Sequence, residues 1–176
     1  FNEIVNCDIF IISIPTPINN QNKPYTKEII KFCKTLSLKI KKKFTLILES
    51  TVYPGFCDNE IKSIFERKNF KINKDFFLGY SPERINPGKT KFKLNKIVKV
   101  ISGSNDETIN LLKTIYSKVT TAGLYKAESI KIAEAAKVIE NIQRDVNVAL
   151  INEFAKIFKK MDINIYKVLD AASTKW

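Results

Sequence analysis

The sequence predicts an α/β protein in which a parallel, Rossmann-like sheet is followed by a long-helix all-α domain. Two observations carry this prediction. In the first part of the chain, short apolar runs rich in β-branched residues alternate with segments of helical period, which is the pattern of βαβ units. Further on, residues 126–161 contain no Gly and no Pro and repeat apolar residues at helical spacing, which indicates one long helix.

The first predicted element is a strand over residues 8–14. Its continuous apolar character predicts burial on both faces, and Pro15-Thr16-Pro17 closes it in a rigid loop. Thr26 then caps a helix that reaches Lys42. The inward face of this helix is predicted to carry Ile29, Ile30, Phe32, Cys33, Leu36 and Ile40.

Strands and helices continue to alternate after this helix. The order favours parallel strands joined by right-handed crossovers. The predicted elements are a strand over 44–48, a helix over 58–68, strands over 76–80 and 97–101, a helix over 106–117 and, after the long helix, a short helix over 163–172.

The long helix has two faces of different character. Its polar face carries Glu134, Lys137, Asn141 and either Arg144 or Asp145, so it is either a solvated face with i,i+4 pairs or a ligand-binding face. A helix of this length, roughly 50 Å at 1.5 Å per residue, is typical of a connection between two domains or two subunits. We expect a domain boundary between residues 122 and 123. The apolar face carries Ile132, Ala136, Ile139, Val146, Leu150, Phe154, Ile157 and Met161.

Composition and charge limit the function. The net charge is +12, yet 27 of the 30 basic residues are Lys, whereas bidentate phosphate and base contacts favour Arg. Specific nucleic-acid binding is therefore disfavoured, and a non-catalytic basic module that binds polyanions stays an alternative. Without His, imidazole cannot serve as a base or metal ligand, and we expect no metal. No apolar run reaches the length of a membrane span and no secretion leader is recognisable, so we expect a cytoplasmic protein.

Three loops follow predicted strands and carry polar groups. They are Pro15-Thr16-Pro17, Glu49-Ser50-Thr51 and Ser81-Pro82-Glu83-Arg84. Each alone is typical of a turn, a cap or a surface ion pair. Because ligands of open parallel sheets bind beyond the carboxyl ends of the strands, the three together predict a binding site.

Four motifs in order give the chain a resemblance to a known family. They are IPTP at 14–17, ESTVYPG at 49–55, GYSPERINPG at 79–88 and AEAAKVIENIQRDVNVALINE at 133–153. The chain resembles the nucleotide-sugar 6-dehydrogenases, and within them the branch that acts on UDP-N-acetylhexosamines for bacterial surface polysaccharides, most of all the Vi-antigen type. The resemblance implies NAD as cofactor, a UDP-sugar as substrate and a homodimer through the long helix.

The resemblance also implies an activity and roles for particular residues. The family oxidises the C6 alcohol of the sugar to a carboxylate in two NAD-dependent steps, through an aldehyde and a thioester on a cysteine. Pro15 and Thr16 would lie along NAD, and Ser50 and Thr51 on its nicotinamide side, with Thr51 helping proton movement near C6.

The remaining roles implied by the resemblance concern the substrate. Glu83 matches the base proposed for the hydrolytic step. Lys137 matches the lysine that stabilises the oxyanion, and Asn141 its neighbour that holds the sugar and a water. The loop Arg84, Ile85, Asn86 and Pro87 would line the substrate.

Two parts of the family pattern are not recognisable in this sequence. No Gly forms the GxGxxG turn that cradles the NAD pyrophosphate, and none of Cys7, Cys33 and Cys57 stands in the motif of the nucleophile. We therefore expect an internal fragment that lacks the first βαβ half and is inactive alone. Cys57, near a helix start, is interpreted as structural, with a lowered pKa as the alternative. A UDP-glucose dehydrogenase and the product of a degraded gene remain alternatives.

Overall fold

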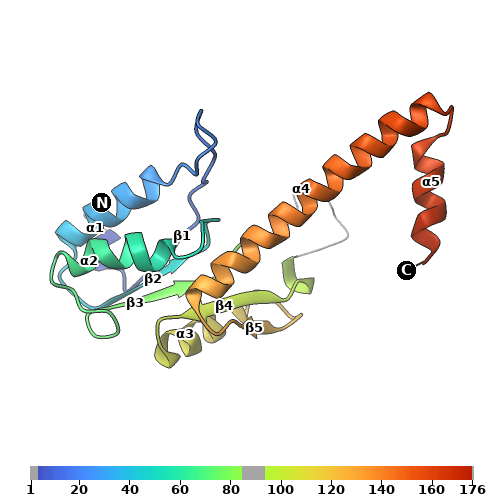
Figure 1. The fold of residues 1–176 in the computed structure, drawn as a ribbon. Coiled ribbons are helices and arrows are strands. Elements are labelled where there is room, and N and C mark those ends of the chain that lie inside the picture. Colours follow the sequence, from blue (N-terminus) through green and yellow to red (C-terminus); the bar gives the residue numbers. More distant parts are fainter. Residues whose placement is uncertain (1–3, 85–93, 176) are drawn as a thin grey trace. The chain divides into compact units, whose positions relative to one another are not determined.

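The structure of the chain, a computed structural model, describes residues 4–84 and 94–175 (Figure 1). The chain divides into two compact units, residues 1–138 and residues 139–176. The first unit contains the sheet and the helices that cover it, and the second contains most of the long helix and the short helix after it.

The first unit is built on a five-stranded sheet in the order β1-β2-β3-β4-β5. Pairs β1-β2, β2-β3 and β4-β5 are parallel. The strands predicted over 44–48 and 76–80 are confirmed at their bounds, the fourth strand begins two residues later than predicted, and the short β5 was not predicted. The strands are β1 (Ile9–Ile12), β2 (Phe44–Leu48), β3 (Phe76–Tyr80), β4 (Lys99–Gly103) and β5 (Leu124–Lys126).

The strand pair β3-β4 is antiparallel, with Gly79 opposite Gly103 and Tyr80 opposite Ser102. The uniform parallel direction expected from the sequence is therefore wrong at this one pair. A parallel neighbour needs a crossover, usually a helix, to carry the chain back to the starting edge. The described part of the β3-β4 connection contains only the 3-10 helix η3 (Leu94–Lys96), so β4 starts at the edge where β3 ends.

The prediction that the first strand is buried on both faces is wrong. β1 is an edge strand whose residues alternate, with Phe10 and Ile12 buried and Ile9 and Ile11 exposed, Ile11 by 49%. The described residues cover only the face that carries Phe10 and Ile12, which explains the alternation.

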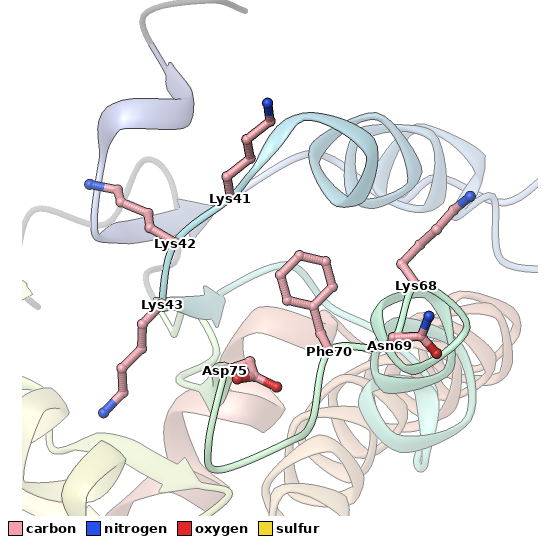
Figure 2. Close-up of a pocket in the computed structure, with 7 residues that line it drawn as sticks. All are labelled: Lys41, Lys42, Lys43, Lys68, Asn69, Phe70 and Asp75. Carbon is pink, nitrogen blue, oxygen red and sulfur yellow. The ribbon is translucent and has the colours of Figure 1, made fainter.

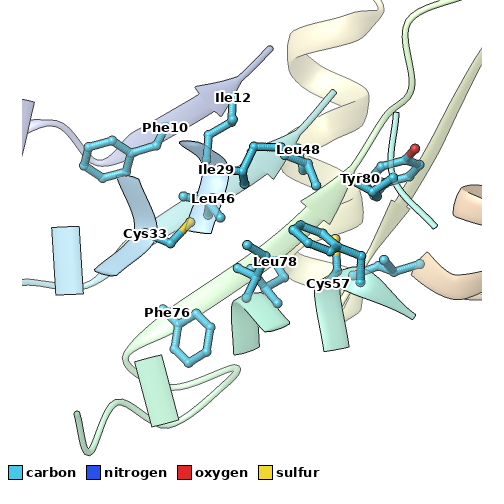
Figure 3. Packing of buried hydrophobic residues seen from close by; sticks show 14 of the residues in the cluster. Phe10, Ile12, Ile29, Cys33, Leu46, Leu48, Cys57, Phe76, Leu78 and Tyr80 are labelled. Carbon is cyan, nitrogen blue, oxygen red and sulfur yellow. The ribbon is translucent and has the colours of Figure 1, made fainter. Parts of the chain in front are cut away.

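Helices cover both faces of the sheet. On one face, α1 (Lys27–Lys39), the π-helical turn η2 (Cys57–Lys62) and α2 (Ser63–Glu66) pack on the first three strands, and Cys33 and Cys57 are part of this core (Figure 3). On the other face, α3 (Asp106–Tyr116) packs against Ile47 and Ile101. The Asn105 side chain caps α3 by accepting from the Thr108 N–H, whereas Thr26 makes no side-chain cap bond to α1.

The long helix α4 (Ile130–Lys160) begins in the first unit and continues in the second. Its buried residues are Ile130, Ala133, Glu134 and Lys137, whereas most of the predicted apolar face, from Ile132 to Met161, is exposed. The buried face at the start of the helix thus combines the apolar Ile130 and Ala133 with Glu134 and Lys137 of the predicted polar face. The remaining elements are α5 (Ile165–Ala172) and the 3-10 helices η1 (Ile4–Asn6) and η4 (Ser173–Lys175). Within the described ranges, no helix is long and apolar enough to span a bilayer.

Candidate active site

The loops that follow β1 and β2 are joined by a hydrogen bond. The Thr16 hydroxyl donates to the Thr51 carbonyl over 2.5 Å. Ser50, which is buried, donates from its hydroxyl to the carbonyl of Ile12 at the end of β1, 3.4 Å away. Thr16, Ser50 and Thr51 are therefore brought together at the carboxyl ends of two adjacent parallel strands, and Pro15 precedes them on an exposed stretch.

The loop after β3 carries Glu83 and Arg84 at the same end of the sheet, where the parallel strands β1 to β3 have their carboxyl ends. The Glu83 side chain is 48% exposed, and its Oε1 accepts from the Arg84 backbone N–H over 2.7 Å. The Arg84 guanidinium donates to the carbonyl of Val98 over 2.8 Å, which ties this loop to the residue before β4. The predicted substrate residues Ile85, Asn86 and Pro87 lie outside the described residues.

A buried lysine that was not predicted as a site residue lies beside this loop. Lys99, the first residue of β4, is 6% exposed. Its ammonium is 3.4 Å from Glu49 Oε1 and 4.0 Å from Glu83 Oε2. The Tyr116 hydroxyl donates to the same Glu49 oxygen over 2.6 Å. One cation thus lies between the carboxylates that follow β2 and β3.

The environment of Tyr116 keeps its hydroxyl protonated. Burial, followed by the hydrogen bond to Glu49 and the negative charge of Glu49, raises the pKa of Tyr116 far above its usual range. The Lys99 ammonium lies over its ring, 4.8 Å from the centroid. Tyr116 is therefore a fixed hydrogen-bond donor to Glu49, supplied by α3.

Glu134 attaches the start of α4 to the turn that follows Thr51. Its carboxylate, fully buried, accepts from the backbone N–H groups of Gly55 at 2.5 Å and Cys57 at 2.9 Å, at the start of η2. Gly55 has a φ of +90°, a conformation that favours Gly. Burial raises the pKa of Glu134, although the two N–H donors oppose this shift. Glu134 is thus a structural cap and not part of a solvated face.

Lys137 follows Glu134 by one turn of α4 and is 8% exposed. It shares the face of the helix that packs against the first unit, because residues three apart lie on one side of an α-helix. The solvated-face interpretation is therefore wrong for Glu134 and Lys137. Asn141, one further turn along α4, is half-buried and belongs to the second unit, whereas Arg144 and Asp145 are exposed.

Two of the three cysteines, Cys33 and Cys57, are buried and are held as thiols. Burial raises the pKa of Cys33 to about 12. Burial, and then the negative charge of Glu134, raises the pKa of Cys57 well above its usual value, so the alternative of a lowered pKa at this helix start is wrong. Cys7 is exposed. Within residues 4–84 and 94–175, no group of acidic and thiol side chains could hold a metal ion.

A surface pocket of about 330 Å³ is lined in part by Lys41, Lys42, Lys43 and Lys68. Figure 2 shows these four side chains pointing in different directions. Lys42 pairs with Asp8 at 2.7 Å and Lys43 with Glu107 at 3.6 Å. The pocket therefore has no converging set of ammonium groups to bind a polyanion.

Fold and motifs agree with one family. Residues 1–120 match the NAD binding domain of the UDP-glucose/GDP-mannose dehydrogenase family and residues 131–176 match its central domain, so the chain belongs to this family. The resemblance drawn from the four motifs is thereby confirmed.

The most informative relatives act on N-acetylated sugars according to their names. The UDP-N-acetyl-D-glucosamine 6-dehydrogenases of Pseudomonas aeruginosa and Salmonella typhi are each 46% identical over 175 residues, which is 99% of this chain and 42% and 41% of the relatives. The chain thus spans about two fifths of their length. The UDP-N-acetyl-mannosamine dehydrogenase Cap5O of Staphylococcus aureus matches with a TM-score of 0.81 at 32% identity, over 95% of this chain and 41% of that protein.

Proposed function

We propose that the protein containing these residues is an NAD-dependent UDP-N-acetylhexosamine 6-dehydrogenase, which supplies a uronic acid for bacterial surface polysaccharides. The observation that carries the proposal is the 46% identity to two UDP-N-acetyl-D-glucosamine 6-dehydrogenases over 99% of the chain. The gathering of the Thr16, Thr51 and Glu83 loops at one sheet edge supports it.

The residues at the ends of β1 and β2 fit NAD. Pro15, Thr16, Ser50 and Thr51 bring hydroxyl and backbone groups, and the hydrogen bond from Thr16 to Thr51 holds the two loops together. The Glu49 carboxylate at the end of β2 is paired with Lys99 and Tyr116. NAD, when bound, accepts a hydride from C6 of the sugar. Thr16 would lie along it, and Ser50 and Thr51 would contact its nicotinamide side.

Lys137 is proposed to stabilise the negative charge that develops on the C6 oxygen. An ammonium on a helix and largely withdrawn from water does this better than one in bulk solvent, and one such donor is typically worth roughly 3 kcal/mol of barrier. Thr51 would help to move the proton of this alcohol. Asn141 would hold the sugar and an ordered water, and Arg84 to Pro87 would line the substrate.

Glu83 is proposed as the base of the hydrolytic step. Its carboxylate would take a proton from water as the water oxygen attacks the thioester carbonyl, and the C–S bond would then break to release the cysteine thiolate. The 48% exposure of the Glu83 side chain supports this role, because the carboxylate can reach water and substrate while the backbone N–H of Glu83 donates to the Glu49 carbonyl over 3.4 Å.

The test is an NADH assay on the longest protein encoded around these residues, with UDP-N-acetylglucosamine, UDP-N-acetylgalactosamine and UDP-glucose. We expect two NADH per N-acetylated sugar and a loss of about 100-fold or more in kcat for Lys137→Ala. Glu83→Gln should release two NADH per active site in a burst and then stall, because both oxidations precede hydrolysis. Turnover of UDP-glucose alone would favour the UDP-glucose 6-dehydrogenase alternative, and no turnover with any sugar would refute the proposal.

The exposed apolar face of α4 supports a homodimer through the long helix. Val146, Leu150, Phe154 and Ile157 recur at steps of four, four and three, and each is at least 40% exposed. We expect Leu150→Glu to convert a dimer to a monomer in light-scattering measurements. The control variant Lys159→Glu reverses a charge on the opposite side of the same helix and should leave the molecular mass in solution unchanged. A monomeric wild type would refute the dimer.

Three further expectations stay proposals: a domain boundary between residues 122 and 123, a cytoplasmic location, and catalysis that uses no metal. The non-catalytic polyanion-binding module stays the alternative from another class. It predicts tight binding to heparin or nucleic acid that weakens steeply with salt, and the divergent lysines around the Figure 2 pocket disfavour it.

A further inference from the structure

Lys99 is a lysine in a position where lysine is unusual. Lysine is almost never fully buried unless it is paired, and here the ammonium lies near several groups of negative potential. Besides Glu49 and Glu83, the Pro82 carbonyl lies 3.5 Å away, and the Tyr116 ring completes the surroundings. All of these groups except Tyr116 lie at the carboxyl ends of β2 and β3.

The strand direction explains why Lys99 lies there. In the antiparallel pair β3-β4, Tyr80 is opposite Ser102. Continuing this register by three residues along each strand sets Glu83 opposite Lys99. If β4 were parallel to β3, its first residue would lie at the other edge of the sheet. The reversal therefore delivers a cation to the edge at which the proposed catalytic loops gather.

Each oxygen of the Glu83 carboxylate has a partner, Oε1 through a hydrogen bond of 2.7 Å and Oε2 through an ionic contact of 4.0 Å. Oε1 accepts from the Arg84 N–H, and Oε2 faces the Lys99 ammonium. Lys99 is itself held by Glu49, which receives the Tyr116 hydroxyl. We infer that Lys99 is a positioning residue that holds the Glu83 carboxylate in one orientation through the chain Tyr116, Glu49, Lys99, Glu83. For its effect on turnover this inference rests on the proposed function.

The expected effect of removing the ammonium is on catalysis rather than on substrate binding. Lys99→Met keeps the length of the side chain and removes its charge. We expect kcat to fall about 10- to 100-fold, as for a misplaced catalytic group, with KM changed by less than about threefold. Lys99→Arg, which keeps the cation, should restore most of kcat. Lys126→Met, on the neighbouring strand β5 and paired with Asp106 at 3.2 Å, is the matched control and should behave as wild type.

A double variant separates positioning from a general loss of structure. If Lys99 acts through Glu83, Lys99→Met should cost little more once Glu83→Gln is present, because effects of residues that act as a unit are not additive. Additive losses would overturn the inference while leaving the proposed function intact. Should Lys99→Met not fold, Tyr116→Phe replaces it: this variant removes the hydroxyl that holds Glu49 and should lower kcat several-fold with KM unchanged.

Hydrogen exchange tests the same contact without any turnover. In Lys99→Met the amide of Arg84 should exchange about tenfold faster than in wild type, as expected for the loss of one hydrogen bond, and in Lys99→Arg and Lys126→Met it should not. If the wild type oxidises no UDP-sugar, the proposed function fails and this measurement alone decides whether Lys99 holds Glu83. Unchanged exchange in Lys99→Met would overturn the inference in either case.

Discussion

Replacing Glu134 with Ala should strongly destabilise the first unit. The change leaves the N–H groups of Gly55 and Cys57 buried without their acceptor. Hydrogen bonds to charged groups contribute about 1.5–3 kcal/mol each, so two of them amount to roughly 3–6 kcal/mol. The carboxylate is fully buried, and the cost of withdrawing its charge from water offsets part of this gain. We expect a net loss of about 3 kcal/mol.

Urea unfolding followed by circular dichroism measures this loss. With a slope of about 2 kcal/mol per molar, the midpoint should fall by about 1.5 M. Glu134→Gln, with a single acceptor oxygen, should lie between wild type and Ala. Glu153→Ala is the control on the same helix, because it removes only an exposed pair with Lys156 and should cost under about 0.5 kcal/mol. Equal shifts for Glu134→Ala and Glu153→Ala would refute the capping role.

Three further predictions concern residues of the first unit. Because the pKa of Glu134 is raised, the free energy of unfolding of wild type, compared with that of Glu134→Gln, should be most favourable below the unfolded pKa of about 4.5 and should decline as pH rises through the folded pKa. Urea titrations at successive pH values measure this difference, and a difference that rises with pH would contradict the prediction. With a thiol reagent such as DTNB, Cys7 should react in the native state and Cys33 and Cys57 only after unfolding, so fast release from all three would contradict their burial. Gly79→Ala should cost about 1–3 kcal/mol in urea unfolding, because its Cβ would lie 2.9 Å from the buried Leu112, and an unchanged midpoint would show that α3 can move away.

The sequence predicts the buried elements of this fold well. Strands β2 and β3 are continuous apolar runs buried on both faces, so periodicity and flanking turns locate them to the residue. β5 was missed because its three residues are partly or fully exposed and show no alternation. The direction of β4 was missed because apolar periodicity carries no information on direction, which depends on the connection between two strands.

The sequence predicted the loops of the site but not the buried residues that hold these loops in place. Thr16, Thr51 and Glu83 follow strands in recognisable motifs, whereas Lys99 looks like an ordinary polar residue. One signal was available: Lys99 interrupts the apolar run from Ile97 to Ile101, where an unpaired charge would be costly. Similarly, Glu134 is flanked by small Ala residues that permit a close approach of the backbone of η2, and burial follows from that approach.

The reversal of strand direction at β4 has a consequence for how members of this family can diverge in length. Side chains alternate along a strand, so the insertion or deletion of one residue inside β4 would turn Lys99 away from Glu83 and exchange the faces of the sheet on which Val100 and Ile101 are buried. Length changes between residues 84 and 98 leave that register untouched. Insertions and deletions among relatives should therefore accumulate in the connection and be absent from the stretch Lys99–Gly103.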